Sequence, residues 1–264
     1  MKKYYTRACN FYYGTNAKQL IKKKLALPLC GNKNIAFDRL EVITRDKNKV
    51  SSKTIHFNKI SKLSAPSKKK VSQDLKNIVQ KRKNFLKNVN FLETSIMGVL
   101  NLTPDSFSDG GKFNSQKKAK IHILNMVNSG ANIIDVGGES TRPGSKTVLT
   151  NNEWKRIKDV VKNFKKTFNN VALSIDTRKS EVMIKSIELG ADLINDVSGF
   201  NFESQSLSKL KRYNIAKVLH HMQGTPNTMQ KSPKYKNVLL DIYDFFEENI
   251  KMYYWIFMIF LKIS

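Results

Sequence analysis

The sequence is poor in cysteine, in acidic residues and in long apolar runs. Only two of its 264 residues are cysteines, Cys9 and Cys30, and they have no CxxC or zinc spacing. This excludes a disulfide framework and a cysteine metal site, and it suggests a reducing compartment. The basic N-terminus lacks the apolar stretch of a signal peptide, and the most apolar segment, 252–263, is shorter than the ~20 residues that span a bilayer. We therefore expect a cytoplasmic protein with no membrane partner.

Acidic residues are outnumbered, with 21 Asp and Glu against 47 Lys and Arg and a net charge of +26. Residues 1–90 hold 23 basic and 4 acidic residues, a net charge of +19, whereas 91–264 hold 24 and 17, a net charge of +7. Such an excess can indicate nucleic-acid binding. Most of the basic residues are lysines among many Asn and Ile, however, a bias that an AT-rich genome produces without selection for a partner. Nucleic-acid binding through the N-terminal region is therefore the weaker alternative.

The chain divides into three zones. Residues 1–65 form a basic N-terminal region with one clear strand candidate, 35–45. The sequence of this region does not indicate its function. Residues 66–90 begin as a Ser/Pro/Lys linker and continue as an amphipathic helix over 72–89. Such a basic helix could bind RNA or an acidic membrane, but packing on a neighbouring domain is the simpler interpretation. Residues 91–264 form the third zone.

The third zone alternates short apolar strands with helices. The expected strands lie in SIMGVLNLT, NIIDVGG, VALSIDT, ADLINDVSG and IAKVLHHMQG, and the expected helices at 115–129, 152–168, 179–189, 203–212 and 237–250. Continuous apolar strands alternating with helices predict a parallel sheet.

Polar residues stand at the end of every predicted strand: Asn101, Asp135, Asp176, Asn195 and His220. A doubly wound sheet concentrates its site at one switch point, whereas a TIM barrel assembles its site from the ends of all its strands. The pattern therefore indicates an α/β fold of the TIM (β/α)8 barrel type.

The adjacent histidines His220 and His221 suggest a metal site at first sight. Neighbouring residues of a strand point to opposite faces, so a regular strand cannot direct both side chains to one ion. We expect one of them to face the barrel mouth beside Met222.

Five motifs carry a family resemblance over about residues 94–250: NLTPDSFSDGG, DVGGESTRPG, SIDTRKS, LINDVSGF and LHHMQGTP. In order and spacing they resemble dihydropteroate synthase, a pterin-binding TIM-barrel family. That family condenses 6-hydroxymethyl-7,8-dihydropterin pyrophosphate with para-aminobenzoate in folate biosynthesis, giving 7,8-dihydropteroate and pyrophosphate. The resemblance implies a transferase that acts on these small-molecule substrates.

The first two motifs imply the leaving-group site. By resemblance Asn101 contacts Mg²⁺, and its amide oxygen is a hard ligand that suits this ion. Thr141 and Arg142 would bind the pyrophosphate, for which a planar guanidinium on a glycine-rich loop is well suited. Phe107 and Pro143 would wall the para-aminobenzoate site.

The remaining motifs imply the pterin site. Asp176 and Asn195 would read the 2-amino-4-oxo edge of the pterin, which donates and accepts hydrogen bonds in one plane. Met222 would line the same pocket. Asp105 and Asp109 of the first loop would act in catalysis, by stabilising positive charge that develops on the exocyclic carbon. A neutral aniline is already nucleophilic, so little general-base catalysis is required.

The resemblance stops after the fifth strand. The family continues with an Asp-Pro-Gly motif, a Ser-Arg-Lys motif and an Arg-x-His motif, none of which occurs here, and the last residues become strongly apolar. We therefore expect an incomplete barrel of about five to six βα units, with 252–263 as a frameshift or premature-stop product that substitutes for a sixth strand. The alternative function is a catalytically impaired, truncated remnant that only binds pterin or pyrophosphate. The family dimerises through barrel helices that are missing here, which weighs against a homodimer but leaves it open.

Overall fold

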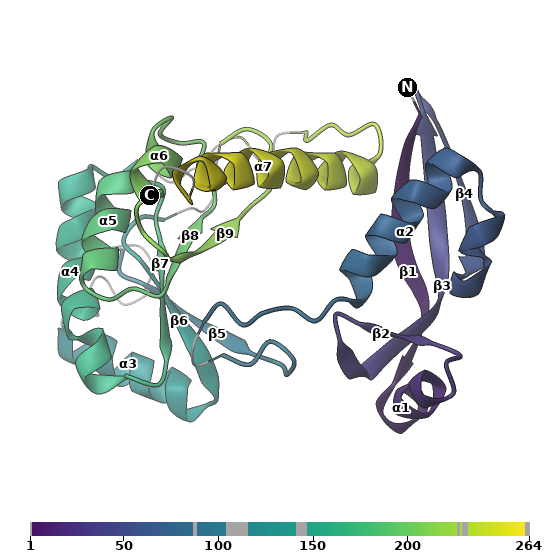
Figure 1. The fold of residues 1–264 in the computed structure, drawn as a ribbon. Coiled ribbons are helices and arrows are strands. Elements are labelled where there is room, and N and C mark those ends of the chain that lie inside the picture. Colours follow the sequence, from purple (N-terminus) through teal and green to yellow (C-terminus); the bar gives the residue numbers. More distant parts are fainter. Residues whose placement is uncertain are drawn as a thin grey trace. The chain divides into compact units, whose positions relative to one another are not determined.

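The computed structural model describes residues 2–86, 89–103, 116–140, 147–225, 228 and 232–261. The chain separates into two compact units, Met1–Lys83 and Asn84–Ser264 (Figure 1). Each unit has its own sheet and its own hydrophobic core, and each is described by itself below.

The first unit is built on an antiparallel sheet. Its elements are β1 (Lys3–Tyr13), α1 (Gly14–Lys22), β2 (Leu27–Leu29), β3 (Asn32–Asp46), β4 (Lys49–His56), a 3-10 helix (Phe57–Lys62) and α2 (Ala65–Val79). The long strand β3 is central. It pairs with β1 along the whole of β1, and it also pairs with β2 and β4. The strand predicted at 35–45 is therefore confirmed as part of β3.

The helix α2 packs on this sheet through Val71, which is fully buried in a cluster with Phe37 and Leu40. It begins at Ala65, just before the expected linker, because Pro66 suits the first turn of a helix, where its missing N–H is not required. It ends at Val79, so the sequence placed both ends of this helix too late. The apolar face of the expected helix wrongly included Phe85, Leu86 and Val89, which belong to the second unit.

The second unit contains five parallel strands in the order β5-β6-β7-β8-β9, as the sequence predicts. They are β5 (Ile96–Asn101), β6 (Ala131–Gly137), β7 (Ala172–Asp176), β8 (Leu193–Asp196) and β9 (Ala216–Leu219). In register, Asn101 pairs with Gly137, Gly137 with Asp176, and Asp176 with Asn195. The carboxyl ends of four strands are therefore level. Within the described residues the five strands form an open sheet and not a closed barrel.

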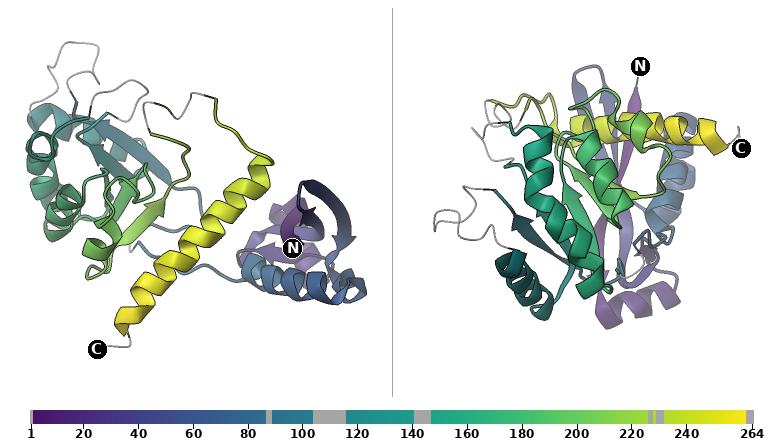
Figure 2. Two further views of the ribbon diagram at one scale, coloured as in Figure 1. Left: turned by 90° about the horizontal axis from the view of Figure 1, so that it is seen from above. Right: turned by 90° about the vertical axis from the view of Figure 1, so that its left-hand side faces the viewer.

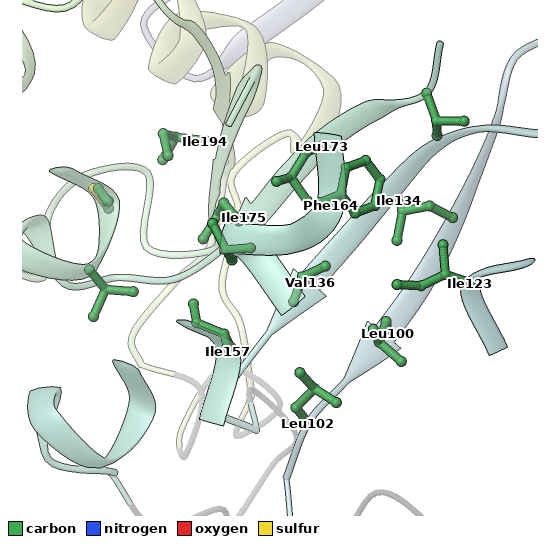
Figure 3. Close-up of a cluster of buried hydrophobic side chains, with 14 of the residues drawn as sticks. Leu100, Leu102, Ile123, Ile134, Val136, Ile157, Phe164, Leu173, Ile175 and Ile194 are labelled. Atoms are coloured by element: carbon green, nitrogen blue, oxygen red, sulfur yellow. The ribbon is translucent and has the colours of Figure 1, made fainter. Parts of the chain in front are cut away.

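Helices follow the strands where the sequence predicts them. They are α3 (Gln116–Asn128), α4 (Thr150–Thr167), α5 (Ser180–Glu188), α6 (Ser206–Leu210) and α7 (Val238–Leu261). Figures 1 and 2 show α3, α4 and α5 side by side on one face of the sheet. The core between these layers contains Ile134, Val136, Leu173, Ile175 and Phe164 (Figure 3).

The end of the chain differs from the expectation of a sixth strand. Residues up to Leu261 continue α7 as a single helix from Val238. Extending an existing helix adds one hydrogen bond for each residue ordered, and no glycine or proline interrupts this stretch. Among the described residues, no helix has the length and apolar character of a transmembrane span.

The opposite face of the sheet changes character along the strands. Near the amino ends, Ile133, Ala172 and Leu193 are covered by Leu86 and Val89 from the segment that precedes β5. Toward the carboxyl ends the same face carries polar side chains. The apolar half of this face packs against the segment that precedes β5. The polar half, at the carboxyl ends of the strands, contains the candidate site.

Gly138, directly after β6, allows α4 to approach the sheet. A Cβ atom here would lie 2.9 Å from both the Glu153 carbonyl oxygen and the Ile157 Cγ2. We predict that Gly138→Ala lowers the free energy of unfolding by about 1–3 kcal/mol through overpacking. Urea denaturation followed by tryptophan fluorescence measures this, since both tryptophans belong to the second unit. The exposed control Ser129→Ala should change stability by less than about 0.5 kcal/mol; equal effects would contradict the close-approach argument.

Candidate active site

The carboxyl ends of the parallel strands bring four predicted positions together. Asn101 ends β5, Asp135 lies near the end of β6, Asp176 ends β7, and Asn195 lies in β8. Strand alternation places these residues on the same face as Ile133 and Ala172, above the apolar half. The sequence therefore placed Asn101, Asp176 and Asn195 correctly at one rim.

Gly137 separates two of these side chains. A Cβ atom at this position would lie 3.2 Å from Asn101 Oδ1 and 3.4 Å from Asp176 Oδ2. The amide oxygen and the carboxylate oxygen thus lie on either side of a space above Gly137. The side chain of any other residue at this position would occupy that space. Hard oxygen donors of this kind suit Mg²⁺. Among the described residues, no three His, Cys, Asp or Glu side chains are placed to hold one metal ion together, so an ion here would also need oxygens from water or from a substrate.

Asp135 is the centre of a hydrogen-bonded chain across three neighbouring strands. Ser174 Oγ donates to Asp135 Oδ1 at 2.5 Å, and Asn195 Nδ2 donates to Asp135 Oδ2 at 2.9 Å. His220 Nε2 lies 2.6 Å from Asn195 Oδ1. Sequence reasoning did not identify Ser174. The available signal was its position two residues before Asp176, which places both on one face of β7.

The acidic groups of the rim have raised pKa values. Burial raises the pKa of Asp135, although hydrogen bonds from Ser174 and Asn195 oppose this. Burial, followed by the negative charge of Asp135 and of other nearby carboxylates, raises the pKa of Asp176 to about 8. Asp176 is therefore largely protonated at neutral pH, and it can both donate and accept a hydrogen bond. Such perturbed carboxyl groups often mark functional sites.

A second group of charges lies buried behind the rim. Lys179 Nζ contacts Glu139 Oε2 at 3.0 Å and Glu153 Oε2 at 2.5 Å, and Arg178 Nη2 lies 3.1 Å from Glu139 Oε2. Glu139 Oε1 accepts the Val148 N–H at 2.9 Å. Burial alone would raise the pKa of Glu139, but the Val148 N–H and Lys179 hold it below its usual value. The network ties the loops after β6 and β7 to α4, and sequence reasoning missed it.

The two adjacent histidines follow β9, which ends at Leu219, and they point to different places. His220 contacts Asn195 at the rim. His221 Nε2 lies 3.0 Å from the Tyr235 hydroxyl, and its ring packs against Phe245 with centroids 4.6 Å apart. His221 therefore anchors α7. Met222 follows and is half-buried.

Six predicted site residues lie outside the described residues. They are Asp105, Phe107, Asp109, Thr141, Arg142 and Pro143. Their roles in catalysis, pyrophosphate binding and para-aminobenzoate binding remain predictions.

Comparison with known proteins identifies the family. The family model described as pterin binding enzyme matches residues 97–253, which is more than half of the chain. The chain belongs to the pterin-binding enzyme family. Within it, the sequence resembles dihydropteroate synthases: 45% identity over 155 residues with that of Escherichia coli, covering 59% of this chain and 54% of the relative. The Synechocystis enzyme is 39% identical over 159 residues, covering 60% of this chain and 55% of the relative.

Solved structures agree with this assignment. The dihydropteroate synthase of Yersinia pestis, in a sulfonamide drug complex, has a TM-score of 0.60 at 39% identity, covering 64% of this chain and 60% of that chain. The Burkholderia cenocepacia enzyme, complexed with 7,8-dihydropteroate, has a TM-score of 0.55 at 34% identity, covering 64% and 56%. The predicted resemblance and barrel-type α/β fold are confirmed. The chain spans just over half the length of these relatives.

We predict a large stability effect when Lys179 is removed from the buried network. Lys179→Met leaves Glu139 and Glu153 without this shared cation, and breaking a buried ion pair costs about 3–5 kcal/mol. The matched control is Lys185→Met, which removes a helical pair with Glu181 at 2.6 Å that is largely exposed, and costs less than about 1 kcal/mol. Urea denaturation of the full chain compares them, and equal losses would contradict the network's role.

A further prediction concerns pH. The pKa of about 8 for Asp176 in the folded chain exceeds the ordinary value of 3.8, so the folded chain holds this proton more tightly than the unfolded chain. The contribution of this group to the free energy of unfolding therefore falls as pH rises between about 4 and about 8. Asp176→Asn should gain stability relative to the native chain by more than about 1 kcal/mol between about pH 5 and about pH 8.5. A stability difference independent of pH would show that the carboxyl is not perturbed.

Proposed function

We propose that this chain acts as a dihydropteroate synthase, joining 6-hydroxymethyl-7,8-dihydropterin pyrophosphate to para-aminobenzoate with release of pyrophosphate. The observation that carries the proposal is the arrangement of Asn101, Asp176 and Asn195 at one level of the sheet, in a chain of this family. These residues combine an amide oxygen that suits a cation with a carboxyl–amide pair that suits a flat heterocycle.

The pterin end of the substrate is assigned to Asp176 and Asn195. The 2-amino group and the neighbouring ring N–H donate, and a carboxylate accepts both in one plane, while an amide both donates and accepts. Two such donors favour the ionised form of Asp176 and lower its pKa from about 8. Dihydropterin binding near neutral pH therefore releases a proton from this group. Met222 would contribute an apolar wall.

The pyrophosphate end is assigned to the neighbouring loops. Asn101, together with oxygens from water and from the substrate, would hold Mg²⁺, which when bound would neutralise charge on the departing pyrophosphate. Thr141 and Arg142 would bind the phosphate oxygens, and Phe107 and Pro143 would flank para-aminobenzoate.

The reaction is a displacement at the exocyclic carbon. The bond from this carbon to the pyrophosphate oxygen breaks, the aniline nitrogen forms the new bond, and its proton leaves to solvent. Asp105 and Asp109 would stabilise the positive charge that develops on the carbon.

The metal assignment is tested with Asn101→Ala. We expect this variant to lose about 10- to 100-fold in Mg²⁺-dependent affinity for pyrophosphate, the effect of about 1.5–3 kcal/mol for a contact to a charged group. Calorimetry with and without Mg²⁺ measures this, with the exposed Asn163→Ala as control. Arg142→Lys should also weaken pyrophosphate binding, because a point charge cannot reproduce a bidentate clamp. Unchanged Mg²⁺ dependence in Asn101→Ala would contradict the ligand role.

A turnover assay separates the synthase from a remnant that only binds. The full chain is supplied with dihydropterin pyrophosphate, para-aminobenzoate and Mg²⁺, and dihydropteroate is measured. Calorimetry in buffers of different ionisation enthalpy then measures the expected proton release on dihydropterin binding. Binding with proton release but no product would favour the impaired remnant, and absence of both would contradict the proposed function.

A further inference from the structure

The hydrogen-bonded chain at the rim has a fixed direction. Asp135 accepts hydrogen bonds from Ser174 Oγ and from Asn195 Nδ2. Asn195 must then turn its Nδ2 toward Asp135 and its Oδ1 toward His220, 2.6 Å away. An amide oxygen only accepts hydrogen bonds. The His220 ring must therefore carry a proton on Nε2 and donate it to Asn195.

The backbone of His220 is held from the other side. Gly199 has a φ of +60°, and a Cβ atom there would lie 2.7 Å from the His220 carbonyl oxygen. The Tyr253 hydroxyl of α7 donates to the Gly199 carbonyl oxygen at 2.6 Å, and its ring packs edge-on against Phe200 with centroids 6.2 Å apart. The His220 backbone is thus packed against a loop that α7 holds in place.

Asn195 has hydrogen-bonding capacity beyond this chain. Its Nδ2 carries a second hydrogen, and its Oδ1 carries a second lone pair. The partners on either side, Asp135 and His220, decide where these two point. If His220 could not donate, one end of the amide would lose its partner, and the orientation of the side chain would depend on Asp135 alone.

We propose that His220 is a positioning residue for pterin recognition: its Nε2–H fixes the Asn195 amide in the orientation that reads the pterin edge. This rests on the proposed function, and it gives the first histidine of the LHHMQG segment a role that its neighbour does not share. His221 contacts Tyr235 and α7 instead.

The test compares three full-length variants by calorimetry with two probes, 6-hydroxymethyl-7,8-dihydropterin and pyrophosphate with Mg²⁺. His220→Leu removes the donor, and the loss of one neutral hydrogen bond lowers dihydropterin affinity about two- to tenfold. His220→Gln keeps an N–H donor on a side chain of similar reach and should restore most of the affinity. His221→Phe retains the aromatic contact with α7 and should bind dihydropterin like the native chain. Pyrophosphate affinity should be the same in all of them.

Two outcomes would overturn the proposal. One is a His220→Leu variant that binds dihydropterin as tightly as the native chain. The other is an equal loss of dihydropterin and pyrophosphate affinity in that variant, because this indicates general damage to the rim and not the loss of Asn195 orientation.

Nitrogen NMR of the full chain provides a readout that needs no ligand. It should show the His220 Nε2–H tautomer and a shift of the Asn195 side-chain amide signals in His220→Leu. A native chain that binds no dihydropterin contradicts the proposed function, and the proposal falls with it. A deprotonated Nε2, or unshifted Asn195 signals, contradicts the His220 assignment itself, so the two failures are distinguishable.

Discussion

The level register of the parallel strands is the constraint on which the site depends. Because Asn101 pairs with Gly137, Gly137 with Asp176, and Asp176 with Asn195, residues from four separate stretches of sequence meet at one height. Strand alternation then sends the helix-facing residues of each strand into the core and their neighbours to the opposite face. A shift of one strand by a single residue would exchange core and site residues together. The same strand register therefore produces both the apolar core of this unit and its polar rim.

The second unit was largely predictable because its strands are short apolar runs between helices that bury one side. The first unit was not, since only Tyr5 of the eleven residues of β1 is buried and the strand shows no regular alternation of apolar and polar residues. The apolar end of α7 was wrongly expected as a substitute sixth strand because the resemblance to the family stops after the fifth strand and leaves a sheet edge to be covered. Its helical state depends on continuity with the preceding turns, which local composition does not reveal.

Within the site, the sequence predicted that Asn101, Asp176 and Asn195 lie at one rim, but not the hydrogen bonds that are made there. The sequence predicted that one of the two histidines faces the site, and the contact between His220 and Asn195 shows which one does. Glu153 was not recognised because its role depends on how α4 packs against the loops after β6 and β7. A buried glutamate in an amphipathic helix has no local signal that distinguishes it from the solvated ones.

The buried network explains why Asp176 is available at the rim. The nearest cations in its own loop, Arg178 and Lys179, contact Glu139 and Glu153 behind the sheet. Both cations are therefore paired with glutamates. The carboxyl of Asp176 lies among other carboxylates, and its pKa is raised to about 8. A carboxyl in this state gains the most from a ligand that brings donors or a cation, because either one relieves the cost of ionisation. The charges that stabilise the fold behind the rim thus leave Asp176 in the state that the proposed binding of dihydropterin requires.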